Sequence, residues 1–353
     1  MRARISGLGQ WLPSEVRDNT AWPPEFVARS RASEQRELVD VAGSFASNAD
    51  AIAARYFASE AADPFLGSTR RRIAPADMTA PAAEALAAEA ALADAGVEAK
   101  DIDAVFSWAA VPERIVPPSA PQVAARIGAT SAYAAGMDAG CATPLTQLEA
   151  AAALIESGRA RHVLLTQSHL ITRTFALMHP ASPNVGDAAT AMVVSAAERG
   201  LPLVTFARTH GEYYSSVTWC RGKESDPPWW EAGPAYYLGS QNRAQAQELM
   251  RGTVRFAAET IQELLRRSNV PLDEIDVLAS VQPRRWVPAA IREALGMRAE
   301  APQTFDELAH LGGCGVVTNL IQARAAELLT PGSKSVLYAQ GAGFTRAAAL
   351  VCW

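Results

Sequence analysis

One cysteine, Cys141, has a setting that could make it a nucleophile. It lies in the small-residue turn Asp138-Ala-Gly-Cys-Ala-Thr-Pro-Leu145, ahead of apolar residues spaced three to four apart. That spacing predicts a helix from Thr143 to about Ser157. The N–H groups and dipole at the start of this helix would stabilise a thiolate at Cys141. The alternative is a buried structural thiol, because free cysteines are among the most buried residues.

An internal duplication places a second Gly-Cys turn later in the chain. Asp103 matches Asp276, Cys141 matches Cys314, and Gln167 matches Gln340, each pair 173 residues apart. Each copy is predicted to run helix, acidic loop, buried strand, loop, helix, strand, which favours parallel strands joined by helical crossovers. The repeat alone accounts for Cys314, so we interpret that thiol as structural.

The two copies predict an α/β protein of two α/β/α halves, residues 1–200 and 201–353, related by a pseudo-twofold axis. Segments at about 22–66, mostly helical in pattern, and about 211–240, rich in Trp, Tyr and Pro, have no counterpart in the repeat. Such additions form caps, tunnel walls or dimer contacts. A further helix is expected from about Ala244 to Arg267. The expected strands are Ala104–Trp108, His162–Thr166, Thr190–Ser195, Val277–Val281, Ser335–Tyr338 and Ala347–Val351.

Composition limits the classes of protein that the chain can represent. With 353 residues, 49% hydrophobic and 20% charged, the chain can bury a large core, and its net charge of −5 gives no support for a nucleic-acid partner. No apolar run approaches a membrane span, and the N-terminus lacks a signal peptide's apolar core, so we expect a cytoplasmic protein. Four cysteines without metal-ligand spacing indicate free thiols and no metal site.

Several motifs together resemble the thiolase superfamily, specifically its β-ketoacyl-ACP synthase III (KAS III) branch and relatives from specialised metabolism. They are Ile5-Ser-Gly-Leu-Gly-Gln-Trp-Leu-Pro13, the Cys141 turn, Val185-Gly-Asp-Ala-Ala-Thr-Ala191 and Gln340-Gly-Ala-Gly-Phe344. The resemblance implies a five-layered α/β/α/β/α thiolase fold. It also implies a homodimer in which the central sheets pair.

The resemblance implies that Cys141 takes an acyl group from an acyl carrier protein or coenzyme A thioester. The acyl-phosphopantetheine thioester is then a substrate, and no cofactor is expected. A covalent intermediate of this kind divides one difficult transfer into two easier steps. The backbone N–H groups of Cys141 and, by position in the motif, Gly343 would hold the developing oxyanion.

Two positions depart from the family pattern. The histidine and asparagine that stabilise the enolate formed by decarboxylation are matched here by Val281 and Gly313. Neither side chain can donate a hydrogen bond, so the usual decarboxylating condensation is in doubt. His310, three residues before Gly313, is the candidate replacement base, unless its ring is simply buried beneath the loop. Among the other histidines, His169 follows a strand near the active-site face.

The sequence says less about the acyl donor and about the shape of the acyl tunnel. Residues 61–70 lack the tryptophan that clamps coenzyme A in synthase III, which favours a carrier-protein donor whose acidic surface meets Arg284 and Arg285. Pro117 or its neighbour takes the place of a phenylalanine that enters the partner's acyl pocket, so the tunnel should differ in shape.

Three hypotheses therefore stay open. The first is an acyltransferase of natural-product biosynthesis that passes the acyl group from Cys141 to a second carrier or a small O, N or S nucleophile without decarboxylation. The second is a decarboxylative condensing enzyme rebuilt around His310. The third is a non-catalytic partner subunit.

Overall fold

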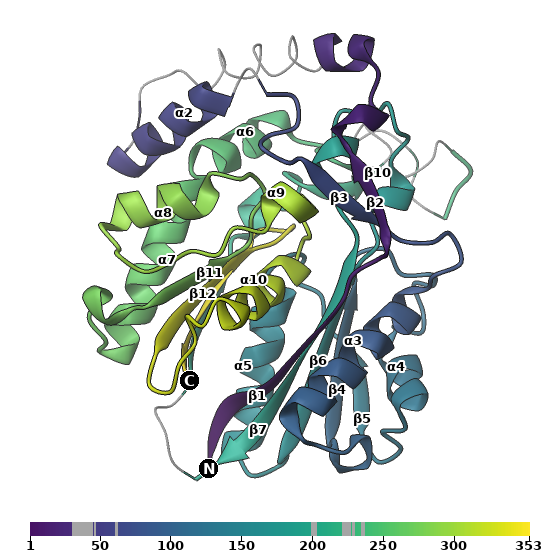
Figure 1. Cartoon of the computed structure of the whole chain (residues 1–353), viewed down its shortest axis with the longest axis vertical. Coiled ribbons are helices and arrows are strands. Elements are labelled where there is room, and N and C mark those ends of the chain that lie inside the picture. Colours follow the sequence, from purple (N-terminus) through teal and green to yellow (C-terminus); the bar gives the residue numbers. More distant parts are fainter. Residues whose placement is uncertain are drawn as a thin grey trace.

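Two sheets with matching strand order form the frame of the molecule (Figure 1). The computed structural model describes residues 1–29, 45, 47–60, 63–198, 203–220, 227, 230–233 and 237–353. In each sheet the strand pairing is parallel at one end and antiparallel at the other, as the duplication requires. The first sheet runs β1 (Arg2–Trp11), β7 (Ala188–Ala197), β6 (His162–His169), β4 (Ala104–Ala109), β5 (Tyr133–Gly136), and the second runs β8 (Val204–Thr209), β13 (Thr345–Cys352), β12 (Lys334–Gln340), β11 (Val277–Ser280).

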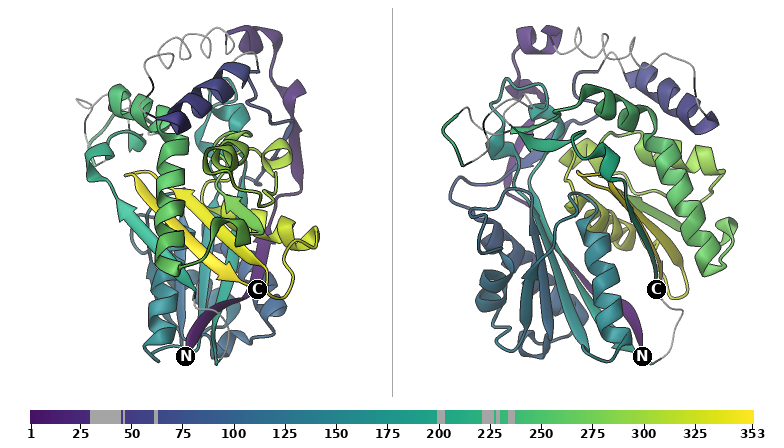
Figure 2. Two further views of the ribbon diagram at one scale, coloured as in Figure 1. Left: turned by 90° about the vertical axis from the view of Figure 1, so that its left-hand side faces the viewer. Right: turned by 180° about the vertical axis from the view of Figure 1, so that it is seen from behind.

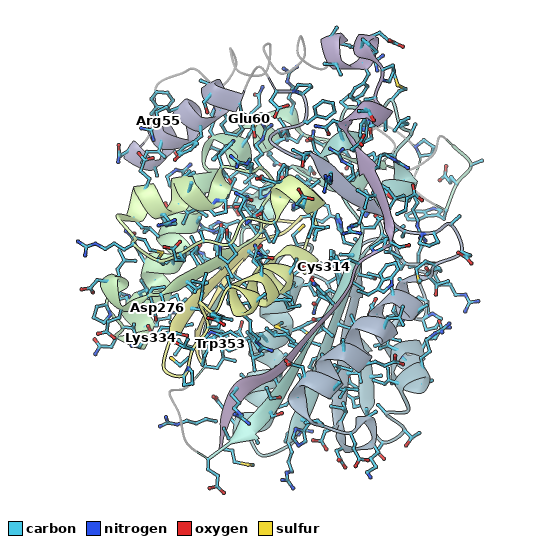
Figure 3. All side chains as sticks on the ribbon, viewed as in Figure 1. Arg55, Glu60, Asp276, Cys314, Lys334 and Trp353 are labelled. Atoms are coloured by element: carbon cyan, nitrogen blue, oxygen red, sulfur yellow. The ribbon has the colours of Figure 1, made fainter. Side chains whose placement is uncertain are left out.

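Two aspartates show the repeat at the level of single hydrogen bonds. The carboxylate of Asp103 accepts the backbone N–H groups of Arg161 and His162 at 2.6 and 3.0 Å, where β6 begins. The carboxylate of Asp276 accepts the N–H of Lys334 at 2.8 Å, where β12 begins (Figure 3). Each aspartate ties the loop before one strand to the start of its parallel neighbour, which explains why both copies have an acidic loop there.

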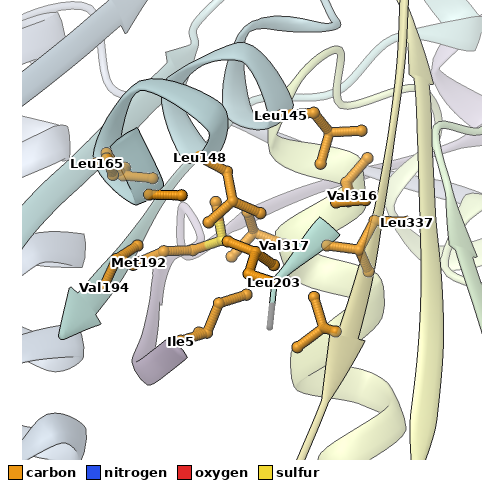
Figure 4. Packing of buried hydrophobic residues seen from close by; sticks show 14 of the residues in the cluster. Ile5, Leu145, Leu148, Leu165, Met192, Val194, Leu203, Val316, Val317 and Leu337 are labelled. Atoms are coloured by element: carbon orange, nitrogen blue, oxygen red, sulfur yellow. The ribbon is translucent and has the colours of Figure 1, made fainter. Parts of the chain in front are cut away.

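Helices fill five layers together with the sheets (Figure 2). Between the sheets lie α5 (Thr143–Glu156) and α10 (Cys314–Ala325), whose apolar side chains meet in one core, with Leu145 and Leu148 near Val316 and Val317 (Figure 4). On the outer faces, α3 (Ala80–Ala95) and α4 (Ala120–Ile127) cover the first sheet, and α7 (Thr253–Ser268) and α8 (Val287–Leu295) cover the second. The predicted α/β/α/β/α thiolase fold is confirmed.

The predicted helix over 244–267 is wrong in one respect, because two helices occupy this range. α6 (Arg243–Arg251) ends at Gly252 and α7 begins directly after it. A Cβ at Gly252 would lie 2.6 Å from the Phe256 ring and 2.7 Å from the Arg255 guanidinium. The chain breaks where a residue without a side chain admits this packing. The six predicted strands and the helix after Cys141 are confirmed.

The described parts of the two segments without a counterpart in the repeat reach the surroundings of the Cys141 turn. Helix α2 (Asn48–Glu60) comes from the predicted insertion at 22–66, and the hairpin β9 (Thr218–Cys220) and β10 (Tyr237–Gly239) from that at 211–240; the rest of both insertions falls partly outside the described residues. No helix within the described ranges is long and apolar enough to cross a bilayer. The remaining elements are β2 (Glu15–Asp18), β3 (Arg70–Ile73), α9 (Phe305–Leu308) and short 3-10 turns at Asn19–Ala21, Ala99–Asp101, Thr172–Thr174, Ser182–Asn184, Gly211–Tyr213 and Leu272–Glu274.

One carboxyl group, that of Glu84 on α3, is fully buried against β6. It accepts hydrogen bonds from the hydroxyls of Thr166 at 2.6 Å and Ser168 at 2.8 Å. Burial raises the pKa of Glu84 to about 8, and these two hydrogen bonds offset the effect only in part. At neutral pH the group is therefore mostly protonated in the folded chain.

Replacing Glu84 should change how stability depends on pH. Between about pH 4.5 and 8 the folded chain holds a proton on Glu84 that the unfolded chain has lost. The contribution of Glu84 to the free energy of unfolding is fully present below pH 4.5 and declines as pH rises to 8. The decline is at most about 1.4 kcal/mol per pH unit. Urea unfolding at pH 5, 6.5 and 8 should show Glu84→Gln gaining on wild type as pH rises. Parallel pH profiles for the two proteins would contradict this assignment.

Candidate active site

The turn that carries Cys141 is braced by its own side chains. A carboxylate oxygen of Asp138 accepts the N–H of Gly140 at 2.8 Å, and the hydroxyl of Thr143 donates to the Gly140 carbonyl at 2.7 Å. Gly140 has φ +57°, a conformation that L side chains rarely adopt. These contacts hold the Cys141 side chain at the start of α5, in the wall of a cavity.

The C-terminal glycine turn packs backbone to backbone against the Cys141 turn. A Cβ on Gly341 would lie 1.9 Å from a backbone oxygen of the Cys141 turn, and one on Gly140 would lie 2.5 Å from the nitrogen of Ala342. Gly341 and Ala342 line the cavity together with Cys141. Gly343, the residue predicted as the second N–H donor, lies one position further on, where its φ of +74° shapes the turn. The residue that the structure places beside Cys141 is therefore Ala342.

His310 lies across from the cysteine, as predicted from its loop. Its Nε2 is 3.9 Å from the Sγ of Cys141, and its Nδ1 is 3.0 Å from the carbonyl oxygen of Gln282. A carbonyl can only accept, so Nδ1 carries the hydrogen and Nε2 presents a lone pair to the thiol. Val281, where the family has a histidine, contributes only apolar wall. The imidazole is thus oriented as a general base toward Cys141.

Burial controls the charge state of this pair. Burial, and then the carboxylate of Asp138, raise the pKa of Cys141 to about 12. Burial, and then the nearby ring of His169, lower the pKa of His310 to about 3. The resting site therefore holds a neutral thiol and a neutral imidazole. Burial thus opposes the thiolate that the start of the helix was expected to stabilise at Cys141.

A second histidine, His169, joins the site from the end of β6. Its Nδ1 is 2.9 Å from the carbonyl oxygen of Gly186, and its ring centroid is 5.8 Å from that of His310. A Cβ on Gly312 would lie 2.4 Å from the His169 ring, so only glycine fits there. Burial lowers the pKa of His169 to about 4. The sequence suggested this residue only through its position after a strand.

The cavity beside Cys141 has a volume of about 490 Å³ and mostly apolar walls. Both insertions contribute to it, Phe57 from α2 and Trp219 from β9, as expected for tunnel walls. Near the cysteine, the indole of Trp108 donates to Asp138 at 2.9 Å. Further lining residues are Ile171, Val217, Leu238, Leu249, Met250, Trp286 and Phe344. The walls suit a bulky apolar group with few polar atoms.

The predicted binding arginines both have acidic partners within the chain. Arg284 lines the cavity and pairs with Glu60 at 2.5 Å, while the exposed Arg285 forms two hydrogen bonds to Asp306 at 2.6 and 3.1 Å. Their charges are thus compensated, and the sequence could not show this. Pro117 lies in an exposed loop and is not among the lining residues of this cavity.

Cys314, the counterpart of Cys141, is fully buried near the centre of the molecule (Figure 3). Its thiol lies 3.6 Å from the carbonyl oxygens of Gln167 and Ala188, and it does not line the cavity. This placement agrees with a structural thiol. Among the described residues, no group of three His, Cys, Asp or Glu side chains is placed to hold a metal ion.

Comparisons with known proteins agree with this geometry. Residues 136–210 match the family model for 3-oxoacyl-[acyl-carrier-protein (ACP)] synthase III, and residues 265–353 match the model for its C-terminal part. The chain is 30% identical to β-ketoacyl-[acyl-carrier-protein] synthase III of Sphingopyxis alaskensis, over 80% of this chain and 86% of the relative. The enzyme of that name from Rhodospirillum rubrum is 28% identical over 99% of both chains.

Solved structures share the fold across the whole chain. The synthase III of Aquifex aeolicus superposes with a TM-score of 0.77 at 20% identity and covers 99% of this chain and 100% of its own. OleA of Xanthomonas campestris, bound to cerulenin, reaches a TM-score of 0.76 at 17% identity and covers 100% of this chain and 97% of its own. These structures share the fold, and the 30% identity to the Sphingopyxis alaskensis enzyme over four fifths of the chain shows that the chain belongs to the β-ketoacyl-[acyl-carrier-protein] synthase III family.

Proposed function

We propose that this KAS III-like protein is an acyltransferase of natural-product biosynthesis. It takes an acyl group from an acyl carrier protein or coenzyme A thioester onto Cys141 and passes it, without decarboxylation, to a second carrier or a small O, N or S nucleophile. The observation that carries the proposal is the 3.9 Å approach of the His310 Nε2 lone pair to the Cys141 thiol. A base in this position serves thioester attack and acyl handover.

In the first step Cys141 becomes acylated. The thiol proton moves to Nε2 of His310 as Sγ attacks the thioester carbonyl, because neither group is charged beforehand. The N–H groups of Cys141 and Ala342 hold the oxyanion of the tetrahedral intermediate. The donor's carbon–sulfur bond then breaks, and its thiolate takes the proton back from His310.

In the second step the acceptor replaces the donor. His310 removes a proton from the acceptor, which attacks the acyl-Cys141 carbonyl, and the departing Cys141 thiolate regains that proton. Decarboxylation of a malonyl unit would instead generate an enolate that needs hydrogen-bond donors. Val281 and Gly313 offer none through their side chains, and His310 presents a lone pair, which favours handover without loss of carbon dioxide.

A homodimer is part of the proposal. Strand β5 forms an edge of the first sheet, with Tyr133 65% exposed, and the loop before α4 exposes Ile115 and Val116. A free edge strand can pair with a second copy. A carrier protein would then approach the surface around Arg285, although Asp306 weakens its attraction for an acidic partner.

Loading of the cysteine is the first test. Intact-protein mass spectrometry after incubation with acyl carrier-protein and acyl-coenzyme A thioesters should show an acyl adduct on wild type and on Cys314→Ala. The adduct should vanish in Cys141→Ala, because Cys141 lies in the cavity wall and Cys314 does not. Carbon dioxide release from a malonyl donor would support the condensing alternative. No adduct with any donor would support the non-catalytic one.

The pH dependence of loading tests the role of His310. Because the pKa of His310 lies near 3 and that of Cys141 near 12, the single-turnover loading rate should stay flat from pH 5 to 9. His310→Asn keeps a donor for the Gln282 carbonyl but lacks the lone pair at Nε2, so we expect loading to slow by about 10²–10⁴-fold. A wild-type rate that falls with a midpoint near pH 6.5 would contradict the assigned charge states.

A further inference from the structure

We infer that His169 is a second catalytic residue, whose Nε2 accepts a hydrogen bond from the O–H, N–H or S–H group of the acceptor and orients it toward acyl-Cys141. The inference rests on the proposed function and names the chemical class of its acceptor. That class is a neutral nucleophile with a hydrogen to donate, in contrast to an enolate or a carboxylate.

The hydrogen bonds of the two histidines set the polarity of the site. The carbonyl of Gly186 holds the Nδ1 hydrogen of His169, and the carbonyl of Gln282 holds that of His310. In each neutral ring Nε2 is then the acceptor. Both rings line the same cavity as Cys141, and burial keeps both uncharged.

The loop at Gly312 packs against the ring edge of His169 that carries the Nε2 lone pair. A Cβ on Gly312 would lie 2.4 Å from Cδ2 and 2.8 Å from Nε2 of His169, so this edge of the ring faces the loop that carries His310. The two rings meet at an interplanar angle of 71° with centroids 5.8 Å apart. The rings are thus in edge-to-face contact, and because both line the cavity, a small polar group beside them can contact both, one ring as base and the other as hydrogen-bond acceptor.

The lone pairs of the two histidine rings disfavour an anionic acceptor, such as an enolate or a carboxylate. Two lone pairs that face one space repel an anion and attract a polarised hydrogen. An enolate would meet lone pairs where it needs donors, whereas an alcohol, amine or thiol satisfies the buried acceptor. The proton count balances, because His310 takes the acceptor proton and returns it to Cys141 while His169 only accepts a hydrogen bond.

Separate measurement of the two half-reactions tests this role. Acyl-enzyme is prepared with the donor that loads wild type and is then mixed with 1-propanol or propylamine as probe acceptors, because transfer to a pantetheine thiol is the reverse of loading. Loss of the acyl mass is followed over time. In His169→Asn the amide can still donate to Gly186 but lacks Nε2. We expect loading within about threefold of wild type and transfer to the preferred probe slower by about 10²-fold.

Matched variants separate catalysis from packing. His169→Gln places an amide oxygen near the position of Nε2 and should recover part of the transfer rate, while His310→Asn should slow both half-reactions. Thermal unfolding checks that each variant folds. Equal losses in loading and transfer for His169→Asn, or no loss in either, would overturn the inference while leaving the proposed function intact. Failure of wild type to load would overturn both.

Discussion

The backbone contact between two glycine turns is the constraint on which the site depends. The Cys141 turn comes from the first half of the duplicated chain and the turn at Gly341 from the second, and each needs glycine where they touch. This contact brings the backbone nitrogen of Ala342 against Gly140, the residue before Cys141. Any side chain at Gly140 or Gly341 would push the halves apart beside Cys141. The two halves of the fold are related by the repeat, but they contribute different turns to this one site.

Burial is the second determinant of the site, because it shifts the pKa values of Cys141, His310 and His169. Cys141 and His310 are partly buried in the cavity wall and His169 is buried, so desolvation favours the neutral form of each. The helix that follows Cys141 cannot offset this effect, since the thiol is desolvated and Asp138 lies beside it. Carbonyl oxygens then decide which ring nitrogen carries hydrogen. A few backbone contacts therefore turn two imidazoles into a pair of acceptors.

The duplication made much of the fold predictable. Asp103 and Asp276 anchor equivalent strands, so their spacing revealed the two halves and hence the layers. Cys141 and the helix after it could be predicted because the small-residue turn and the spacing of apolar residues are local signals in the sequence. The break at Gly252 was not predicted, because it depends on the Phe256 ring packing against the backbone. The contact of His169 with His310 and the pairing of Arg284 with Glu60 join residues far apart in sequence, which no spacing shows.

The high pKa of the Cys141 thiol has a consequence for life in an oxidising or electrophile-rich environment. Peroxides and alkylating metabolites react with thiolates far faster than with thiols. A cysteine that stays protonated until a thioester fills the cavity offers such reagents little to attack. The same burial that makes this nucleophile sluggish at rest therefore protects it from irreversible damage between turnovers.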